Sequence, residues 1–380
     1  MLIPNNVQKT KMFQYAGASR FAYNWALARE IENYEKGGKF ISDAELRKEF
    51  TKLRHSDEYA WLLSISNNVT KQAIKDACTA YKNFFKGLQK FPRFKSKKRS
   101  MPKFYQDNVK IQFSNTHVKF EGFSSSRKAN KQKMNWVRLA EHGRIPTDVK
   151  YMNPRISFDG LNWWISVCVE FPDCIEKLND DGIGIDLGIK DLAICSDGAK
   201  YKNINKSQKV KKLEKQKRRL QRSISRSYEK NKKGESYCKT NNVIKKEKLL
   251  LKRNHRLTNI RKNYLDQTIS EIVNRKPRFI CIEDLNVSGM MKNRHLSKAV
   301  QEQGFFWFRK QLEYKCSDKG IQLIVADRFY PSSKLCSCCG NIKKDLKLSD
   351  RVYRCACGNI IDRDFQASIN LKAYGERFAS

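Results

Sequence analysis

Apolar residues in the first 95 positions recur every three or four residues, which is the spacing of helices that bury one face. The run from Ser42 to Glu45 has the spacing of a capping box, in which a serine and a glutamate satisfy free backbone groups at a helix start. We therefore predict a helical domain at 1–95, with its aromatic residues in the core rather than stacked on bases. One predicted apolar face consists of Val69, Ala73, Ala77, Tyr81, Phe84, Phe85 and Leu88.

Between 96 and about 172 the apolar spacing changes to every second residue, which is typical of strands with one buried face. Val109, Ile111 and Phe113 alternate with polar residues. Further along, Asp159 and Gly160 form a hairpin signal between two more alternating runs. This section predicts a β domain at 96–178.

An apolar strand at 183–189 opens a third unit. In the segment 201–264, apolar residues are spaced by threes, fours and sevens on both sides of a polar stretch at about 225–241, which predicts two long helices and a connecting loop. The same segment holds 23 Lys/Arg and 4 Asp/Glu, a net charge of +19 in a chain whose net charge is +38. A purely structural hairpin needs far fewer cations, so we predict that these helices contact nucleic acid.

The basic composition of this 380-residue chain narrows its possible classes of function. A net charge of +38 favours a protein whose self-repulsion is offset by a bound nucleic acid, with a ribosomal-type basic protein as the alternative. Cationic loops at 93–99 and 127–133 are open to two interpretations, as phosphate contacts or as solvated loops. No apolar run has the roughly 18 residues of a membrane span, and the start lacks a signal-peptide pattern, so we expect a cytoplasmic protein without a membrane partner.

Acidic residues stand in or beside three apolar segments. Asp186 lies in the strand at 183–189 between two glycines, which leave room for a ligand close to the backbone. Glu283 and Asp284 end a second apolar strand, and Asp362 and Asp364 precede a run with helical spacing. Taken alone, each acid is interpreted as a cap, a turn residue or a salt-bridge partner.

Convergence of these acids in the fold would have a chemical meaning. Magnesium prefers oxygen ligands, so three carboxylates that meet would suit two divalent cations. Two such ions can activate a water molecule and stabilise the leaving oxygen in a phosphoryl displacement.

Twelve cysteines in a chain without signs of secretion predict metal ligands rather than a disulfide framework. Five of them form two knuckles separated by fifteen residues, which is close to the spacing of a zinc ribbon. We predict Cys336, Cys339, Cys355 and Cys357 as the ligands of a structural Zn2+, with Cys338 as the substitute. No histidine lies nearby in the sequence, which favours an all-thiolate site. The scattered cysteines are expected to be buried thiols.

The order of these motifs resembles the TnpB family of transposon-encoded proteins. The resemblance rests on 184–188, on 282–285, on the two cysteine knuckles and on 362–364, and the runs 17–25, 91–95 and 330–334 agree with it. Members of this family are RNA-guided DNA endonucleases with a RuvC-type nuclease domain, related to compact type V CRISPR effectors. The resemblance extends over nearly the whole chain.

The resemblance implies an α+β multidomain protein. Its parts would be a helical recognition domain at 1–95, a β-barrel wedge domain at 96–178, and an RNase H-like (RuvC) α/β nuclease domain at 179–335 and 359–380, with a zinc ribbon inserted at 336–358.

The resemblance also implies an active site in which Asp186, Glu283 and Asp364 bind Mg2+, with two ions expected. Asp364 is preferred to Asp362 because it aligns with the first residue of the family pattern Asp-x-Asn-Ala-Ala. By the same analogy Arg328 holds the scissile phosphate, with an ordinary surface arginine as the alternative.

The chain departs from the family pattern in three places. Gln366 and Ser368 stand where Asn and Ala are usual, and the knuckle of Cys355 and Cys357 is a compact variant. The lysine-rich strand that usually precedes a segment like the one at Leu2 is nearly absent, so we expect an incomplete or differently closed wedge domain.

The resulting hypothesis is an RNA-guided DNA endonuclease. A guide RNA would select target DNA by base pairing, and a two-metal RuvC centre would hydrolyse phosphodiesters. The expected protein is a prokaryotic, cytoplasmic monomer that becomes nucleoid-associated when bound to DNA. The alternatives are an RNA-guided repressor or transposon regulator that binds DNA without cleavage, and a DNA-rejoining transposase.

Overall fold

The computed structural model describes residues 1–123, 134–170, 177–347 and 350–379. Contacts within the chain divide it into two units, Met1–Phe171 and Pro172–Ser380, and each is described by itself. The cationic loop predicted at 127–133 lies outside the described residues. Within the described ranges, no helix combines the length and the apolar character needed to span a bilayer.

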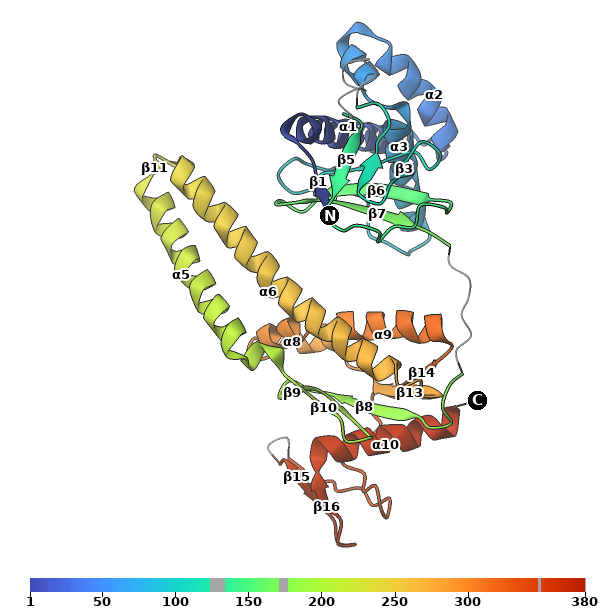
Figure 1. Ribbon diagram of the computed structural model, residues 1–380, viewed down its shortest axis with the longest axis vertical. Coiled ribbons are helices and arrows are strands. Elements are labelled where there is room, and N and C mark those ends of the chain that lie inside the picture. Colours follow the sequence, from blue (N-terminus) through green and yellow to red (C-terminus); the bar gives the residue numbers. More distant parts are fainter. Residues whose placement is uncertain (124–133, 171–176, 348–349, 380) are drawn as a thin grey trace. The chain divides into compact units, whose positions relative to one another are not determined.

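Helices make up the first part of the first unit, as predicted (Figure 1). The predicted capping box is present, because the Ser42 hydroxyl accepts a hydrogen bond from the Glu45 amide at 3.2 Å and the Glu45 carboxylate accepts one from the Ser42 amide at 3.0 Å. The predicted apolar face is buried as far as Tyr81 but is wrong at its end, since the helix stops at Phe85 and Leu88 is 70% exposed. The helices are α1 (Asn6–Glu35), α2 (Asp43–Arg54), η1 (Asp57–Ser64) and α3 (Asn67–Phe85).

The remainder of this unit is a seven-stranded antiparallel sheet in the order β2-β6-β7-β1-β5-β4-β3. The first strand, β1, has only two residues and pairs with β5 and β7 in the interior of the sheet. Among the described residues the end strands β2 and β3 do not pair, so the barrel implied by the family resemblance is not closed, which agrees with the expected incomplete closure. The strands are β1 (Leu2–Ile3), β2 (Lys103–Tyr105), β3 (Gln112–Phe113), β4 (His117–Lys119), β5 (Trp136–Leu139), β6 (Met152–Phe158) and β7 (Trp163–Cys168).

The strand predicted through Val109 is a turn. Asp107 accepts hydrogen bonds from the backbone amides of Val109 and Lys110, at 3.0 and 3.2 Å, and this local bonding replaces strand pairing. Val109 is 88% exposed, so the burial predicted from its apolar side chain is wrong. In the run that starts at Val109, strand pairing begins at Gln112 of β3.

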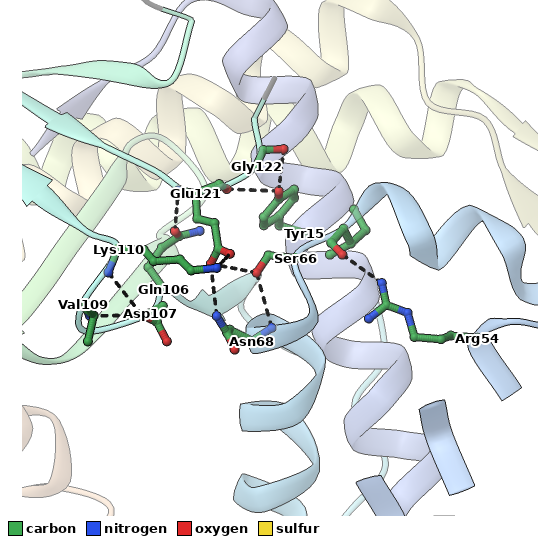
Figure 2. Close-up of polar contacts among 11 residues, drawn as sticks. Tyr15, Arg54, Ser66, Asn68, Gln106, Asp107, Val109, Lys110, Glu121 and Gly122 are labelled. Atoms are coloured by element: carbon green, nitrogen blue, oxygen red, sulfur yellow. Dashed lines mark hydrogen bonds and ion pairs between the residues drawn. The ribbon is translucent and has the colours of Figure 1, made fainter. Parts of the chain in front are cut away.

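A polar cluster joins the helices of the first unit to its sheet (Figure 2). Glu121, after β4, accepts a hydrogen bond from Ser66 at 3.0 Å, and Ser66 caps the start of α3. Tyr15 of α1 is fully buried, and its hydroxyl donates to the carbonyl of Gly122 at 2.8 Å. Helices α1 and α3 are thereby attached to the same short segment, which directly follows β4.

Tyr15→Phe is expected to destabilise the first unit by about 1–2 kcal/mol, because the carbonyl oxygen of Gly122 then loses a buried donor. Tyr105→Phe is the matched control, since its hydroxyl bonds Asn108 at the exposed surface and its loss should cost less than about 0.5 kcal/mol. Urea unfolding of the full chain, followed by near-ultraviolet circular dichroism, measures both. Equal losses in the two variants would contradict this role for Tyr15.

The second unit is built on a five-stranded sheet in the order β10-β9-β8-β13-β14, in which β8, β13 and β14 are parallel. Helices α6 and α9 cover one face and α10 covers the other (Figure 1). Alternate residues of β13 divide between these faces, so that Ile280 and Ile282 pack towards α6 and α9 while Phe279 and Cys281 pack towards α10. The strands are β8 (Ile183–Leu187), β9 (Asp191–Cys195), β10 (Lys200–Lys202), β13 (Phe279–Glu283) and β14 (Gln322–Ala326).

The two long basic helices predicted from the sequence are present as α5 and α6, which pack side by side (Figure 1). Val210, Leu213 and Leu257 form the buried cluster between them. Their connection contains a small hairpin, β11–β12, in place of an irregular loop. The remaining elements are η2 (Ile204–Lys206), α5 (Gln208–Lys230), β11 (Lys232–Lys233), β12 (Ser236–Tyr237), α6 (Asn241–Val273), α7 (Val287–Met290), α8 (Ser297–Gln303), α9 (Phe305–Lys319), β15 (Val352–Arg354), β16 (Ile360–Asp362) and α10 (Arg363–Phe378).

Helix α10 lies very close to β8 at Gly184. A Cβ atom at this position would come within 2.0 Å of the Ser368 carbonyl oxygen and 2.3 Å of the Lys372 amide nitrogen. The prediction that Gly184 leaves room for a ligand is therefore wrong, because the helix backbone fills the space. The glycine instead lets α10 approach the strand that carries Asp186.

Candidate functional site

The three acids predicted to converge line one cavity of about 380 Å³ in the second unit. Asp186 and Glu283 lie near the carboxyl ends of the neighbouring parallel strands β8 and β13, and both are on the face of the sheet that α10 covers. Asp364 enters from the first turn of α10. Parallel pairing of two strands and close packing of one helix thus bring together residues from three distant segments.

Electrostatics in this cavity disfavour three charged carboxylates without a counter-ion. Burial, together with the negative charges of Asp364 and Glu283, raises the pKa of Asp186 to about 7. Burial and the neighbouring charge of Asp284 raise the pKa of Glu283 as well. A divalent cation would offset both effects, and oxygen ligands are those that Mg2+ prefers, so the chemistry of these side chains suits Mg2+. Among the described residues only the four cysteines form a compact set of metal-ligating atoms, so this argument rests on the shared cavity and the donor chemistry of the acids.

Asp364 has cationic partners at the same cavity. The Arg363 guanidinium donates to one Asp364 oxygen at 3.2 and 3.0 Å, and Arg351 lies 3.8 Å from the other. Asp362 is occupied as the helix cap, since it accepts hydrogen bonds from the amides of Asp364 and Phe365. Of these two acids, only Asp364 lines the cavity in the described part of the chain.

Arg328 does not line this cavity in the described part of the chain. It follows β14 and forms an ion pair with Asp284 at 2.5 Å, while Arg309 binds the other oxygen of Asp284 at 2.8 Å. These two arginines hold the pKa of Asp284 below its usual range, although burial opposes them. Arg328 is 49% exposed, which leaves part of its guanidinium open to solvent.

The sequence reasoning missed several residues of the cavity. Arg363 lines the cavity and stands between Asp362 and Asp364 in the sequence. Its position between two candidate acids could therefore have indicated a place in the site. Ser332 and Ser333 also line the cavity and lie in the run 330–334, which the family resemblance used without giving these serines a role. Arg351 lines the cavity too, but its segment carries no local pattern. Only the fold brings these segments to the acids.

The four cysteines predicted as zinc ligands form a tight cluster. The sulfur atoms of Cys336, Cys339, Cys355 and Cys357 all lie within 4.8 Å of one another. The pairs Cys336–Cys357 and Cys339–Cys355 are each 3.6 Å apart. Four thiolates at a Zn–S distance of about 2.3 Å form a tetrahedron with edges of about 3.8 Å, so this set fits zinc.

Cys338 is exposed and lies outside this cluster, as expected for the substitute ligand. The scattered cysteines are only partly as predicted, since four of them are buried but Cys168 and Cys238 are exposed. Cys174 lies outside the described residues.

Cations line a second cavity of the second unit, of about 600 Å³, along α5. Arg261 in this cavity is neutralised, because it binds Glu214 at 3.1 Å and Glu302 at 3.2 Å. The other cations of the lining are Lys211, Lys215, Arg218, Arg219, Arg222 and Lys298. The predicted cationic surface therefore has a concave part that could hold phosphate groups.

Family models and known proteins match this chain over most of its length. Residues 166–294 match the family model OrfB_IS605, described as "Probable transposase", and residues 305–371 match the "Cas12f1-like, TNB domain". Residues 1–39 match a helix-turn-helix domain of the same OrfB family. An Escherichia coli K12 protein, "Putative RNA-guided DNA endonuclease InsQ", is 30% identical over 373 residues, which span 93% of this chain and 85% of that protein.

The chain belongs to the TnpB family. A second relative, a "Putative RNA-guided DNA endonuclease" of Streptomyces pristinaespiralis, is 29% identical and spans 98% of this chain and 87% of that protein. The fold is also similar to that of a Cas12f1 chain solved in a complex with single guide RNA and target DNA, with a TM-score of 0.59, 14% identity and coverage of 95% of this chain and 81% of that chain. The TnpB assignment therefore covers both units.

Two departures from the TnpB pattern have a structural explanation. Gln366 is fully buried and donates to the Leu335 carbonyl at 2.8 Å, so the residue in place of the usual Asn is bonded to the first knuckle. The Ser368 hydroxyl donates to the Phe365 carbonyl at 2.7 Å within α10, and the helix continues through it. Neither change interrupts α10.

Proposed function

We propose that this TnpB-family chain is an RNA-guided DNA endonuclease whose active site consists of Asp186, Glu283 and Asp364. The observation that supports it most is the single cavity that these three acids line, in a chain whose relatives are named as RNA-guided DNA endonucleases. The finer division into recognition, wedge, RuvC and zinc-ribbon domains is part of the same proposal, as are a monomeric state and a prokaryotic cytoplasmic location.

The three carboxylates would bind two Mg2+ ions. When bound, such ions supply an activated water molecule and stabilise the leaving oxygen, giving 5′-phosphate and 3′-hydroxyl ends. Arg363 orients Asp364 through its two hydrogen bonds and keeps positive charge beside the cavity. Arg328, anchored on Asp284, is the proposed contact to the scissile phosphate on the DNA strand.

The cationic surface of α5 and α6 would hold the guide RNA and its duplex with target DNA by their phosphates. Sequence selection would come from base pairing, and the protein would read duplex shape and a short flanking motif. The zinc ribbon, with Cys336, Cys339, Cys355 and Cys357, would have a structural role.

A cleavage assay tests the proposal against its alternatives. The protein is purified with its bound RNA, which is sequenced, and is then given DNA that matches the guide, with Mg2+ or with EDTA. Cleavage only of matched DNA and only with Mg2+ is expected. Tight binding without cleavage would favour the RNA-guided repressor instead, and joined products would favour a transposase.

The double variant Arg218→Ala/Arg222→Ala is expected to reduce the salt dependence of RNA binding. The slope of log K against log salt concentration is negative, and each lost phosphate contact reduces its magnitude by about 0.7–0.9. Loss of both arginines should therefore reduce the magnitude by about 1.4–1.8. Fluorescence anisotropy across a KCl series measures the slope. Lys36→Ala is the control, because Lys36 is already paired with Glu32 at 2.7 Å, and an equal change there would contradict a specific role for α5.

A further inference from the structure

Helix α10 carries Asp364 in its first turn and is hydrogen-bonded to the zinc ribbon immediately afterwards. The side chain of Gln366 is fully buried, and its amide is bonded at both ends. Its Nε2 donates to the carbonyl of Leu335 at 2.8 Å, and its Oε1 accepts from Asn359 at 2.9 Å. Leu335 directly precedes the zinc-ligand candidate Cys336.

Asn359 continues this network to sulfur. Its Nδ2 lies 3.4 Å from the Sγ atom of Cys336, in addition to its bond with Gln366. Asn370, one turn after Gln366, is also buried and donates to the Leu335 carbonyl at 2.7 Å. Two successive turns of α10 are therefore bonded to the segment that leads into the first knuckle.

The second knuckle is joined to Asp364 along the chain. Cys355 and Cys357 lie in the turn of the β15–β16 hairpin, β16 ends at Asp362, and α10 begins at the next residue. Asp364 is thus held between a hairpin that carries two thiolates and the buried amide of Gln366. A zinc ion that joins both knuckles would fix both of these attachments at once.

We propose that Gln366 and Asn359 are positioning residues that link the zinc ribbon to Asp364, and thereby set the affinity of the acidic cavity for divalent cations. This inference rests on the proposed nuclease function. Groups that orient a metal ligand without touching the metal change affinity or activity by about 10–100-fold when they are removed. Gln366 occupies the position at which the TnpB pattern has Asn, and here its side chain bonds both Leu335 and Asn359.

Gln366→Leu is the main test, because leucine has a similar volume and lacks both hydrogen-bonding groups. The purified variant should keep the wild-type zinc content, the wild-type thermal stability and wild-type RNA binding. Terbium(III) luminescence should show about tenfold weaker binding at the acidic cavity. The Asp186→Ala protein serves as the background control, because its remaining luminescence comes from terbium bound outside the acidic cavity. The Mg2+ concentration for half-maximal cleavage should rise by the same factor.

Ser368→Ala is the matched control, since Ser368 is equally buried on the same helix but bonds only within α10. If Gln366→Leu does not fold, Asn359→Ala provides the test at a partly exposed site and should weaken terbium binding in the same direction. Unchanged terbium affinity in the folded variants would overturn the proposal, and so would an equal loss in Ser368→Ala. Terbium binding requires no cleavage, so failure of the wild-type protein to cut DNA would count against the proposed function alone.

Discussion

Asp186→Ala is expected to abolish DNA cleavage while RNA binding stays at the wild-type level. Burial and two acidic neighbours raise the pKa of Asp186 to about 7, and in the proposed active site its loss removes one of three metal ligands. We expect the cleavage rate to fall at least roughly 10³-fold, which corresponds to about 4 kcal/mol in the activation barrier. Single-turnover cleavage of matched DNA measures the rate, and anisotropy measures RNA binding.

Asp181→Ala is the control for this variant. Asp181 precedes the same strand, is 92% exposed and pairs with Lys372 at 3.6 Å, so it has the same side chain without a place in the cavity. Wild-type cleavage is expected from it. Full cleavage by purified Asp186→Ala would refute the assignment of the active site, whereas loss of RNA binding in that variant would indicate misfolding and require the isosteric Asp186→Asn.

The acids could be predicted because each leaves a local signal that burial explains. A carboxylate in an apolar strand is costly unless it is paired or metal-bound, so Asp186 and Glu283 were candidates, although neither was distinguishable alone from a cap or a salt-bridge partner. Their convergence with Asp364 depended on parallel pairing of β8 with β13 and on the close approach of α10 at Gly184. That approach is a property of the packed fold, and the sequence alone suggested a ligand in the same space.

The wrong predictions for the first unit also concern features that depend on contacts within the fold. Val109 was placed in a strand because alternation cannot distinguish a strand from a turn that Asp107 stabilises locally. The barrel was implied by the family resemblance alone, and spacing along the chain could not show how the sheet would close. The two-residue strand at Leu2 owes its place to partners more than 130 residues away. The long helices α5 and α6 were predictable because their signal is local and repeated.

Cys336→Ser is expected to remove most of the bound zinc and to abolish cleavage although all three acids remain. Cys336 is 2% exposed and contacts both Cys357 and Asn359 through its sulfur atom. Zinc binding by such thiolate sets supplies about 10–16 kcal/mol of apparent free energy, which is also the folding free energy of the ribbon. Without it, the knuckles no longer fix the segments on either side of Asp364. Inductively coupled plasma mass spectrometry measures the zinc, and the guided cleavage assay measures the activity.

Cys338→Ser is the control that shows whether any cysteine substitution in the first knuckle causes the loss of zinc and of cleavage. Cys338 is exposed and lies outside the four-sulfur cluster, so the variant should keep one zinc ion and wild-type cleavage. Zinc loss in Cys338→Ser with retention in Cys336→Ser would exchange the roles of the two cysteines. Cleavage by a zinc-free Cys336→Ser protein would show that Asp364 reaches its working position without the ribbon, and would separate the zinc site from the nuclease chemistry.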